Sequence, residues 1–437
     1  MDERRHEGPS AGQAGELCLA AVAVVAACSS PSQPGVVDVH TAGDVARVAA
    51  PVRLNQIFGD VDRAFVPPVP TLTQSATRVG LWGDDDGASF EHKGRVYFLF
   101  GDGVPTTAGD PARPRDADVV AWADASATPE DGFDVHFFTD DTGLYVPVTL
   151  DGKFMLALQG PDGGFSDGTH VYAFFCLGLA PTYHSVLGVS DDDGLTFRTV
   201  IDTPSSALVH VYPQIVTTSD IDGLSAQWSS PTTVLLFGRR STKPPLLAAA
   251  PLDQVTDATA WRWLTRDAAT GAATWGSNAA AASPVFDFDA GESSSGGFSI
   301  FWLPGVNRWI AFYPVKQENN EIAFRSAPSA LGPWSEPAML FDPDRDQDHG
   351  YCNFVHWGCG PTVFGPSEPV ECCDVDYDPM RYGGWGPGQT GFVYAPQPIL
   401  PWTRSDPASG TSTLYFLMSA GNPYSAMTMR VTLSRTD

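Results

Sequence analysis

Basic residues are scarce in this chain of 437 residues, which has 25 Lys and Arg against 51 Asp and Glu. The formal net charge of −26 repels phosphate backbones and anionic lipid surfaces, so we do not expect nucleic acid as a partner. Charged residues make up only 17% of the chain, whereas Gly and Pro number 43 and 37. This composition disfavours long helices and predicts an all-β fold of short strands joined by turns.

The chain also lacks a convincing membrane span near its start. The apolar run 17–27 (LCLAAVAVVAA) is too short to cross a bilayer but has the length of a signal-peptide core. It resembles a bacterial lipobox with Cys28 as the acylated residue, although the acidic start (Asp2, Glu3) departs from the usual basic region. We therefore expect an extracellular or cell-surface monomer that meets a membrane only through a lipid anchor. The expected parts are a leader (1–28), a linker (29–70) and one domain (71–437).

Cysteine is sparse as well, with seven in the chain. Four of them form a cluster near the C-terminus, and an exported chain is expected to oxidise such a cluster into one or two disulfides of unknown connectivity. A zinc site is the alternative, but the spacing lacks paired CxxC motifs and two adjacent cysteines cannot easily bind one metal. The four are Cys352, Cys359, Cys372 and Cys373; the others are Cys18, Cys28 and Cys176.

A strongly hydrophobic strand pattern recurs five times, and a second apolar segment follows each copy. The copies are RVYFLFGDG (95–103), HVYAFFCLG (170–178), TVLLFGRR (233–240), RWIAFYPV (308–315) and TLYFLMSAG (413–421). Each unit is expected to be a meander of about four strands, as in a propeller blade. The last unit lacks a fourth strand, so we expect N-terminal residues to supply it. The pattern thus predicts a five-bladed β-propeller.

Residues 190–197 (SDDDGLTF) fit the pattern SxDxGxTF and resemble the Asp box of sialidases. In that motif the Asp side chain accepts hydrogen bonds from turn amides, while the Thr and the aromatic residue pack between strands. The motif marks a turn and not a catalytic site. A sialidase is disfavoured, because only one clear Asp box is present and no arginine triad can be assembled from the spacing.

The catalytic candidates are Asp85 and Asp102. If Lys93 and Gly94 close a hairpin, Asp85 faces Asp102 across two paired strands. Opposed residues have Cβ atoms about 4.5–5.5 Å apart. Retaining glycosidases need two carboxyl groups about 5–5.5 Å apart, one as nucleophile and one as acid/base.

The alternative is that Asp84, Asp85 and Asp86 cap a turn or hold Ca²⁺. The alternating acids of 342–348 invite the same calcium interpretation, but they lack the Gly and the terminal Glu of an EF-hand, so a solvated loop is favoured. We expect no resident cofactor and no metal, with Ca²⁺ as the one candidate ion.

The segment WGDDDGASFEHKGRVYFLFGD (82–102) resembles the opening pattern of glycoside hydrolase family 183, formerly domain of unknown function 4185. The two aspartates of that pattern fall on Asp85 and Asp102. The resemblance runs from about Thr77 to Leu433. Further matches include GPDGGFSDGTHVY (160–172), GYCNFVHWG (350–358), GGWGPGQTGFVYAP (383–396) and GNPYSAMTMR (421–430).

The resemblance implies a five-bladed propeller that hydrolyses D-arabinan of mycobacterial arabinogalactan and lipoarabinomannan internally, with retention of anomeric configuration. Two departures stand out. Asp84 and Asp86 replace the usual Thr and Leu beside Asp85, which adds charges able to alter its pKa or bind a cation. Gly297 stands where family members often have Glu, and Glu292 lies five residues earlier.

Several further polar and aromatic residues are candidates to contact a furanose ring. Asp118 and Asp162 are candidate third acids, with turn-capping as the equal alternative. The remaining candidates are Asn353, His356, Arg381 and Trp385. We expect a polysaccharide substrate. The competing hypotheses are a propeller glycosidase acting on another furanan and a degenerate propeller that binds glycan without cutting it.

We predict that the four clustered cysteines brace a loop by disulfide bonds. Thiol labelling of the exported protein without reductant should modify at most one of the four, because disulfide sulfurs do not react. Labelling after reduction should modify all of them. Four reactive thiols in the unreduced protein would rule the braced loop out.

Overall fold

The computed structural model describes residues 41–62, 69–156, 159–178, 183–203, 208–239, 244–288, 297–316, 321–342, 393–421 and 423–436. Strands dominate these residues, and the one α-helix among them is the short α1 (Ser75–Val79). No helix in this part of the chain is long and apolar enough to cross a membrane. The prediction of an all-β fold is therefore confirmed.

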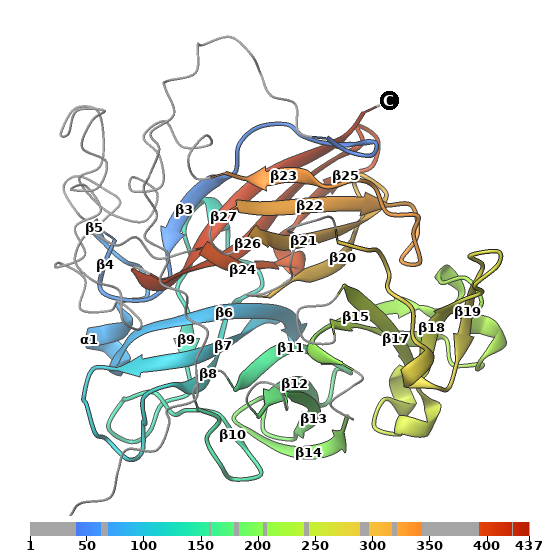
Figure 1. The fold of residues 1–437 in the computed structure, drawn as a ribbon. Helices are drawn as coiled ribbons and strands as arrows, with labels where there is room; N and C mark the ends of the chain where they lie inside the picture. Colours follow the sequence, from blue (N-terminus) through green and yellow to red (C-terminus); the bar gives the residue numbers. More distant parts are fainter. Residues whose placement is uncertain are drawn as a thin grey trace, which may run out of the picture. The chain divides into compact units, whose positions relative to one another are not determined.

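Four sheets are built from strands that follow one another in sequence, and they form a propeller-like arrangement of four blades (Figure 1). The first holds β6 (Leu81–His92), β7 (Arg95–Pro105), β8 (Ala117–Asp124) and β9 (His136–Phe137). The second holds β10 (Thr149–Leu150), β11 (Gly160–Ser166), β12 (Val171–Leu177), β13 (His184–Ser190) and β14 (Thr196–Asp202). The third holds β15 (Val209–Thr217), β16 (Thr232–Arg239), β17 (Pro245–Pro251), β18 (Arg262–Arg266) and β19 (Ala273–Gly276). The fourth holds β20 (Ser299–Leu303), β21 (Arg308–Lys316), β22 (Glu321–Ala327) and β23 (Ala338–Phe341).

Short elements connect these strands. A separate two-stranded sheet pairs β4 (Val61–Asp62) with β5 (Val69–Pro70). The 3₁₀ turns are η1 (Pro129–Asp131), η2 (Thr218–Asp220), η3 (Leu224–Ala226), η4 (Leu252–Gln254), η5 (Ala258–Ala260), η6 (Ala279–Ala281) and η9 (Leu400–Trp402).

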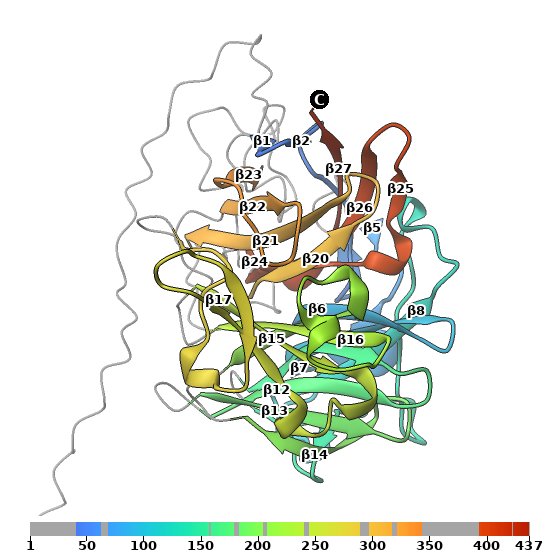
Figure 2. The same cartoon turned by 90° about the vertical axis from the view of Figure 1, so that its right-hand side faces the viewer.

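A further sheet combines the two ends of the described chain (Figures 1 and 2). Its strands are β1 (Thr41–Ala42), β2 (Val45–Arg47), β3 (Val52–Gln56), β24 (Val393–Pro398), β25 (Arg404–Asp406), β26 (Thr411–Gly421) and β27 (Tyr424–Arg435). The last strand, β27, pairs with both β2 and β3. The prediction that N-terminal residues complete the last unit is confirmed. This sheet begins before residue 71, inside the segment expected to be a linker.

The five repeated hydrophobic segments occupy equivalent places. They form β7, β12, β16, β21 and β26. Each is paired on one side with an earlier strand of its sheet (β6, β11, β15, β20 and β24, respectively) and on the other with the following apolar segment. Their side chains are buried along nearly the whole strand; β7, for example, is buried from Val96 to Val104. A strand that is covered on both faces needs a continuous apolar run instead of an alternating one, which is why the pattern was visible in the sequence.

The hydrophobic cores lie between neighbouring sheets. Leu99 of β7 and Phe175 of β12 share one core between the first and second sheets, and both are fully buried. Phe174 of β12 and Leu236 of β16 share the next. Burying one such side chain contributes about 1.5–3 kcal/mol, so contact between sheets supplies most of the stability of each sheet.

The turn at 190–197 matches its predicted structural role. The Asp192 carboxylate accepts hydrogen bonds from the Thr196 amide at 2.9 Å and the Thr196 hydroxyl at 2.7 Å. Phe197 is buried as predicted, but Thr196 is exposed and does not pack between strands. The Thr196 hydroxyl instead donates a hydrogen bond to the Asp192 carboxylate.

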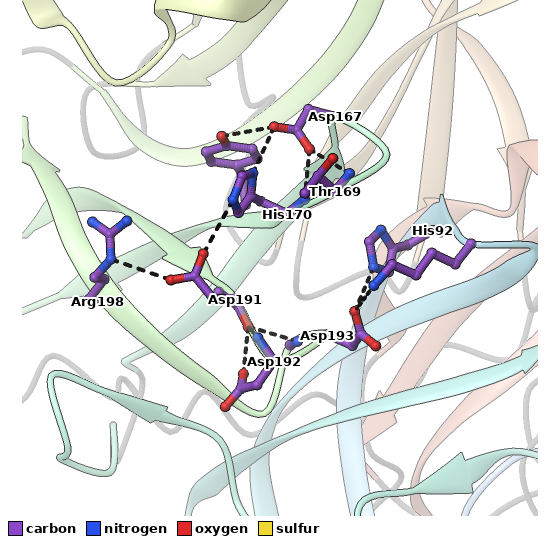
Figure 3. Close-up of polar contacts among 12 residues, drawn as sticks. His92, Asp167, Thr169, His170, Asp191, Asp192, Asp193 and Arg198 are labelled. Carbon is purple, nitrogen blue, oxygen red and sulfur yellow. Dashed lines mark hydrogen bonds and ion pairs between the residues drawn. The ribbon is translucent and has the colours of Figure 1, made fainter.

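The same turn contacts the first sheet, as Figure 3 shows. Asp193 Oδ1 lies 3.0 Å from Nε2 of His92 and 2.5 Å from Nζ of Lys93. The His92 side chain is completely inaccessible, and its Nδ1 lies 2.6 Å from the Ser166 hydroxyl. His92 therefore joins the β6–β7 hairpin to two turns of the second sheet.

We predict that deleting the chain from Gly421 onward destroys the cooperative fold. The deletion removes β27, which is the strand that joins β26 to β2 and β3. The edge of β26 and the apolar side chains beside it would then be exposed, which favours aggregation. We expect an insoluble or molten chain, measured by thermal unfolding and dye binding. A soluble truncation with one sharp unfolding transition would contradict this role of β27.

Candidate active site

The β6–β7 hairpin sets the geometry of the site. The predicted register holds for the five pairs nearest the Lys93-Gly94 turn, and a β-bulge at Gly87 (φ +96°) then shifts it. Asp85 consequently pairs with Gly101, one residue before Asp102. The prediction that Asp85 directly faces Asp102 is wrong, because the bulge places an extra residue in β6 and re-aims the side chains beyond it.

Four non-glycine residues near the site have left-handed backbone. They are Asp86 (φ 60°), Asp102 (φ 66°), His210 (φ 51°) and Ala395 (φ 47°). Each lies at a register shift in the ladder of its strand with a neighbouring strand. Such conformations cost about 1–3 kcal/mol each and persist only where the surrounding structure holds them, which is typical of functional sites.

A cluster of carboxylates surrounds Gly101. An oxygen of Asp86, one of Asp118 and one of Asp85 lie 3.3, 3.6 and 3.7 Å from the position that a Cβ atom would take on Gly101. Three acids from two strands therefore converge on one point. A side chain at residue 101 would crowd them, so the absence of a Cβ atom there is part of the site.

Asp102 lies beside this cluster and is 8% exposed. Its amide donates a hydrogen bond of 3.1 Å to Oδ1 of Asp118. The Tyr424 hydroxyl donates to the carbonyls of Gly101 and Asp102 at 3.3 and 3.2 Å. The backbone around Asp102 is thus held by partners on β8 and β27.

The Asp85 carboxylate accepts a hydrogen bond from the Tyr394 hydroxyl on β24. Burial raises the pKa of Asp85, the charges of Asp86 and Asp102 raise it further, and hydrogen bonds from Tyr394 and Tyr424 lower it. Burial and the nearby carboxylates raise the pKa of both tyrosines, so they remain protonated donors. The charge of Asp86, one of the two acids that depart from the family pattern, thus contributes to the raised pKa of Asp85.

Asp84 and Asp118 form the floor of the cluster, and both are fully buried. Burial raises the pKa of each well above its ordinary value. Among the described residues, Oδ2 of each has no hydrogen-bond partner. Direct contact of Asp118 with substrate does not fit this burial. Capping of a turn by 84–86 does not fit either, because these residues lie within β6.

Asp86 is only partly buried. Burial raises the pKa of Asp86 to about 7, and the charges of Asp162 and Asp102 contribute to the shift. Its amide donates to the Ser419 hydroxyl at 2.8 Å. A carboxyl group with this pKa can keep its proton near neutral pH and donate it, which is the behaviour required of a general acid.

Asp162 lies on β11 beside groups that sequence reasoning missed. Its Oδ1 is 2.8 Å from Nδ1 of His210 on β15. The thiol of Cys176 on β12 is close to both, and burial raises its pKa. Burial lowers the pKa of the nearby Arg239 to about 10. These residues belong to four different strands, so no local motif could have joined them.

Tyr394 and Tyr424 were also missed, although both lie in segments that carry the family resemblance (383–396 and 421–430). The candidate residues Asn353, His356, Arg381 and Trp385 lie outside the described residues, and so do Glu292 and the four clustered cysteines.

Gly297 has a packing reason to be glycine. It has φ +86°, and a Cβ atom there would approach the Ala395 Cα atom to 3.1 Å. A glutamate at this position would therefore require both a strained backbone and a shift of β24. In this chain the backbone of β24 occupies the space that the first atoms of a glutamate side chain would need.

A family profile described as "Domain of unknown function (DUF4185)" matches residues 71–430. The chain belongs to the DUF4185 family. The match covers every strand of the four consecutive sheets and all the carboxylates described above. No curated protein matches the sequence of this DUF4185 chain.

Solved structures resemble the DUF4185 chain at low identity. A proposed hydrolase from Bacteroides ovatus aligns with a TM-score of 0.46 and 10% identity, over 82% of this chain and 87% of the other. A glycosyl hydrolase from the same organism aligns with a TM-score of 0.40 and 9% identity, over 86% of this chain and 96% of the other. An α-L-arabinofuranosidase from Podospora anserina aligns with a TM-score of 0.36 and 8% identity, over 89% of this chain and 99% of the other. Likenesses this distant assign no activity to this chain.

We predict that Asp86→Asn stabilises the DUF4185 chain more at pH 7 than at pH 4. An unfolded aspartate titrates near 3.9, whereas Asp86 in the folded state keeps its proton up to about pH 7. Stability is therefore lost as pH rises through this window, by about 2 kcal/mol once the partial exposure is allowed for. Thermal unfolding of variant and parent between pH 4 and 8 measures the difference.

The exposed Asp141→Asn is the matched control, and its melting curve should follow that of the parent at every pH. A difference in melting temperature between Asp86→Asn and the parent that stays constant from pH 4 to 8 would contradict the raised pKa of Asp86.

Proposed function

We propose that this protein is a five-bladed propeller glycoside hydrolase that cleaves furanosidic bonds with retention of configuration. The observation that carries the proposal is the group of carboxylates at Gly101, where acids with different environments converge. Glycoside hydrolysis needs one ionised and one protonated carboxyl group near the scissile bond. Burial and mutual repulsion are the effects that separate the protonation states of neighbouring acids.

Five blades are supported by the way the cores connect the sheets. The first sheet shares one core with the second and another with the sheet of β24–β27. The third shares cores with the second and the fourth, and the fourth shares one with the sheet of β24–β27. These five cores link the five sheets in a closed cycle. We accordingly take the sheet that joins the two chain ends as the fifth blade.

Asp85 is assigned as the nucleophile. Burial raises the pKa of Asp85, and the hydrogen bonds from phenol groups oppose that shift because they favour the ionised form of a carboxylate. Tyr394 also fixes the direction of the Asp85 side chain. The raised pKa values of Asp86 and its neighbours keep some of the surrounding acids neutral, which reduces the repulsion that an ionised Asp85 experiences.

Asp102 is assigned as the acid/base, with Asp86 as its rival. Asp102 is on the strand opposite Asp85, one residue beyond Gly101, with which Asp85 pairs, and it is buried to nearly the same degree as Asp85. Asp118 then positions Asp102 through its backbone amide instead of touching the sugar. Asp86 has a pKa suited to proton donation, so the experiment has to separate the two.

The proposed substrate is D-arabinan of the mycobacterial type, which is what the resemblance to glycoside hydrolase family 183 implies. Asp162, Asn353, His356, Arg381 and Trp385 are proposed to contact the glycan. Export, with or without a lipid anchor at Cys28, would place the enzyme where cell-wall polysaccharide is found. Cleavage of plant arabinan or levan instead of D-arabinan, or binding without cleavage, would favour the competing hypotheses.

We predict that Asp85→Asn and Asp102→Asn each lower cleavage of mycobacterial arabinogalactan at least about 10²–10⁴-fold. Each change keeps the shape of the side chain but removes a nucleophile or a proton donor. Neither should lower the melting temperature, because each removes one of several crowded negative charges. Reducing-end release and thermal unfolding measure the two effects, with the exposed Asp124→Asn on β8 as control.

An aryl furanoside with a good leaving group separates the roles. Such a substrate needs no proton donor, so the acid/base variant should retain its glycosylation step and form a glycosyl azide of retained configuration when azide is added. The nucleophile variant should give the inverted azide. Full activity of both Asp85→Asn and Asp102→Asn would overturn the assignment, whereas azide rescue of Asp86→Asn would transfer the acid/base role to Asp86.

A further inference from the structure

Asp162, Cys176 and His210 bring three potential metal ligands together. One ligating atom from each side chain lies within 4.8 Å of the other two. Among the described residues, no other trio of His, Cys, Asp and Glu side chains meets this condition. The set is a carboxylate, a thiol and an imidazole, which distinguishes it from the purely acidic cluster at Gly101.

The fold brings the trio together by bulges in two neighbouring strands. Asp162 is the residue at which β11 loses register with β12, and His210 is at the corresponding break between β15 and β16. Cys176 pairs with Gly160 across β12 and β11. Gly163 allows the close approach, since a Cβ atom there would lie 2.6 Å from the carbonyl of Val211.

The burial of the trio is graded from inside to outside. Cys176 is 1% exposed, and the side chains of Asp162 and His210 are 12% and 31% exposed. Oδ2 of Asp162 has no hydrogen-bond partner among the described residues, while Oδ1 is occupied by His210. One carboxylate oxygen of Asp162 is therefore without a hydrogen-bond partner among the described residues, and His210 is the most exposed member of the trio.

We propose that Asp162, Cys176 and His210 bind one Zn²⁺ ion. Nitrogen, oxygen and sulfur ligands together suit zinc, whereas Ca²⁺ and Mg²⁺ take oxygen ligands and would leave the sulfur unused. Ligand bonds of about 2.0–2.3 Å require the three ligating atoms, now within 4.8 Å of one another, to draw closer together around the ion. Three protein ligands leave the fourth tetrahedral position to water, as in zinc sites that are open on one side.

The charge of Arg239 acts on both Asp162 and Cys176. Burial raises the pKa of the Cys176 thiol, and the Arg239 guanidinium opposes that shift by favouring the thiolate form that zinc requires. Zinc, a thiolate, a carboxylate and Arg239 together carry a single positive charge, which the surrounding acids of the site can balance. Binding releases the thiol proton, so affinity should rise with pH.

The ion would join β11 and β12 of the second sheet to β15 of the third. Because these ligands converge only in the folded chain, zinc should raise the melting temperature in proportion to its affinity for the folded state. The proposal does not depend on the glycosidase assignment, since its readouts are zinc content, ligand type and stability, and it makes Asp162 a zinc ligand in place of the glycan contact proposed above.

The test uses the full chain, reduced and freed of metal by a chelator. Isothermal titration with Zn²⁺ should show one tight site that is lost in Cys176→Ser and in His210→Asn, with affinity weakened more than about 100-fold. Asn is chosen at residue 210 because it tolerates left-handed backbone. X-ray absorption of the zinc form should show one sulfur among nitrogen and oxygen ligands.

The control replaces Cys352, Cys359, Cys372 and Cys373 by Ser, which removes every other clustered thiol. This variant should keep the tight site, the single sulfur ligand and the zinc-dependent rise in melting temperature. Equal zinc affinity in the parent and Cys176→Ser, or loss of the tight site in the control variant alone, would overturn the proposal. Circular dichroism shows whether each variant is folded. If Cys176→Ser does not fold, the zinc affinity of His210→Asn tests the proposal instead.

Discussion

Face-to-face packing of neighbouring sheets governs the remainder of the described structure. The cores lie between sheets, and each takes side chains from two of them, such as Leu99 and Phe175. The middle strands of these sheets are therefore apolar along most of their length, and their functional groups, such as Asp102 on β7 and Cys176 on β12, lie near the strand ends. Polar chemistry is left to the first strands and to the ends of strands, where side chains are not required for these cores.

Acidic residues are concentrated on the strands that precede the repeated apolar strands and at the strand ends beside them. Asp85 and Asp86 lie on β6 and Asp162 lies on β11, whereas Asp102 and Asp118 lie near the ends of β7 and β8. Crowding these acids costs free energy, seen as pKa values raised by burial and by neighbouring charges. The large apolar interfaces between sheets offset this cost, so the site depends on packing that lies away from it.

Backbone bulges decide what the gathered side chains can do. The bulge at Gly87 moves Asp85 opposite Gly101 and gives Asp86 a left-handed backbone. Similar irregularities place Asp162 and His210 next to each other across two sheets. The carboxylate cluster and the Asp162–Cys176–His210 trio thus both depend on β-bulges, which lie in β6, β11 and β15.

The sequence alone determined the all-β class, the repeated strands and the pairing of the C-terminal strand with N-terminal residues, because long apolar runs and turn residues are local signals. It also singled out Asp85 and Asp102, through a hairpin turn and a family pattern. The tertiary structure decided the register beyond Gly87, since a bulge costs little locally and leaves no clear trace in the alternation of residues. Only the tertiary structure brought Tyr394, His210 and Cys176 to the aspartates, because strands distant in sequence meet only when the sheets pack.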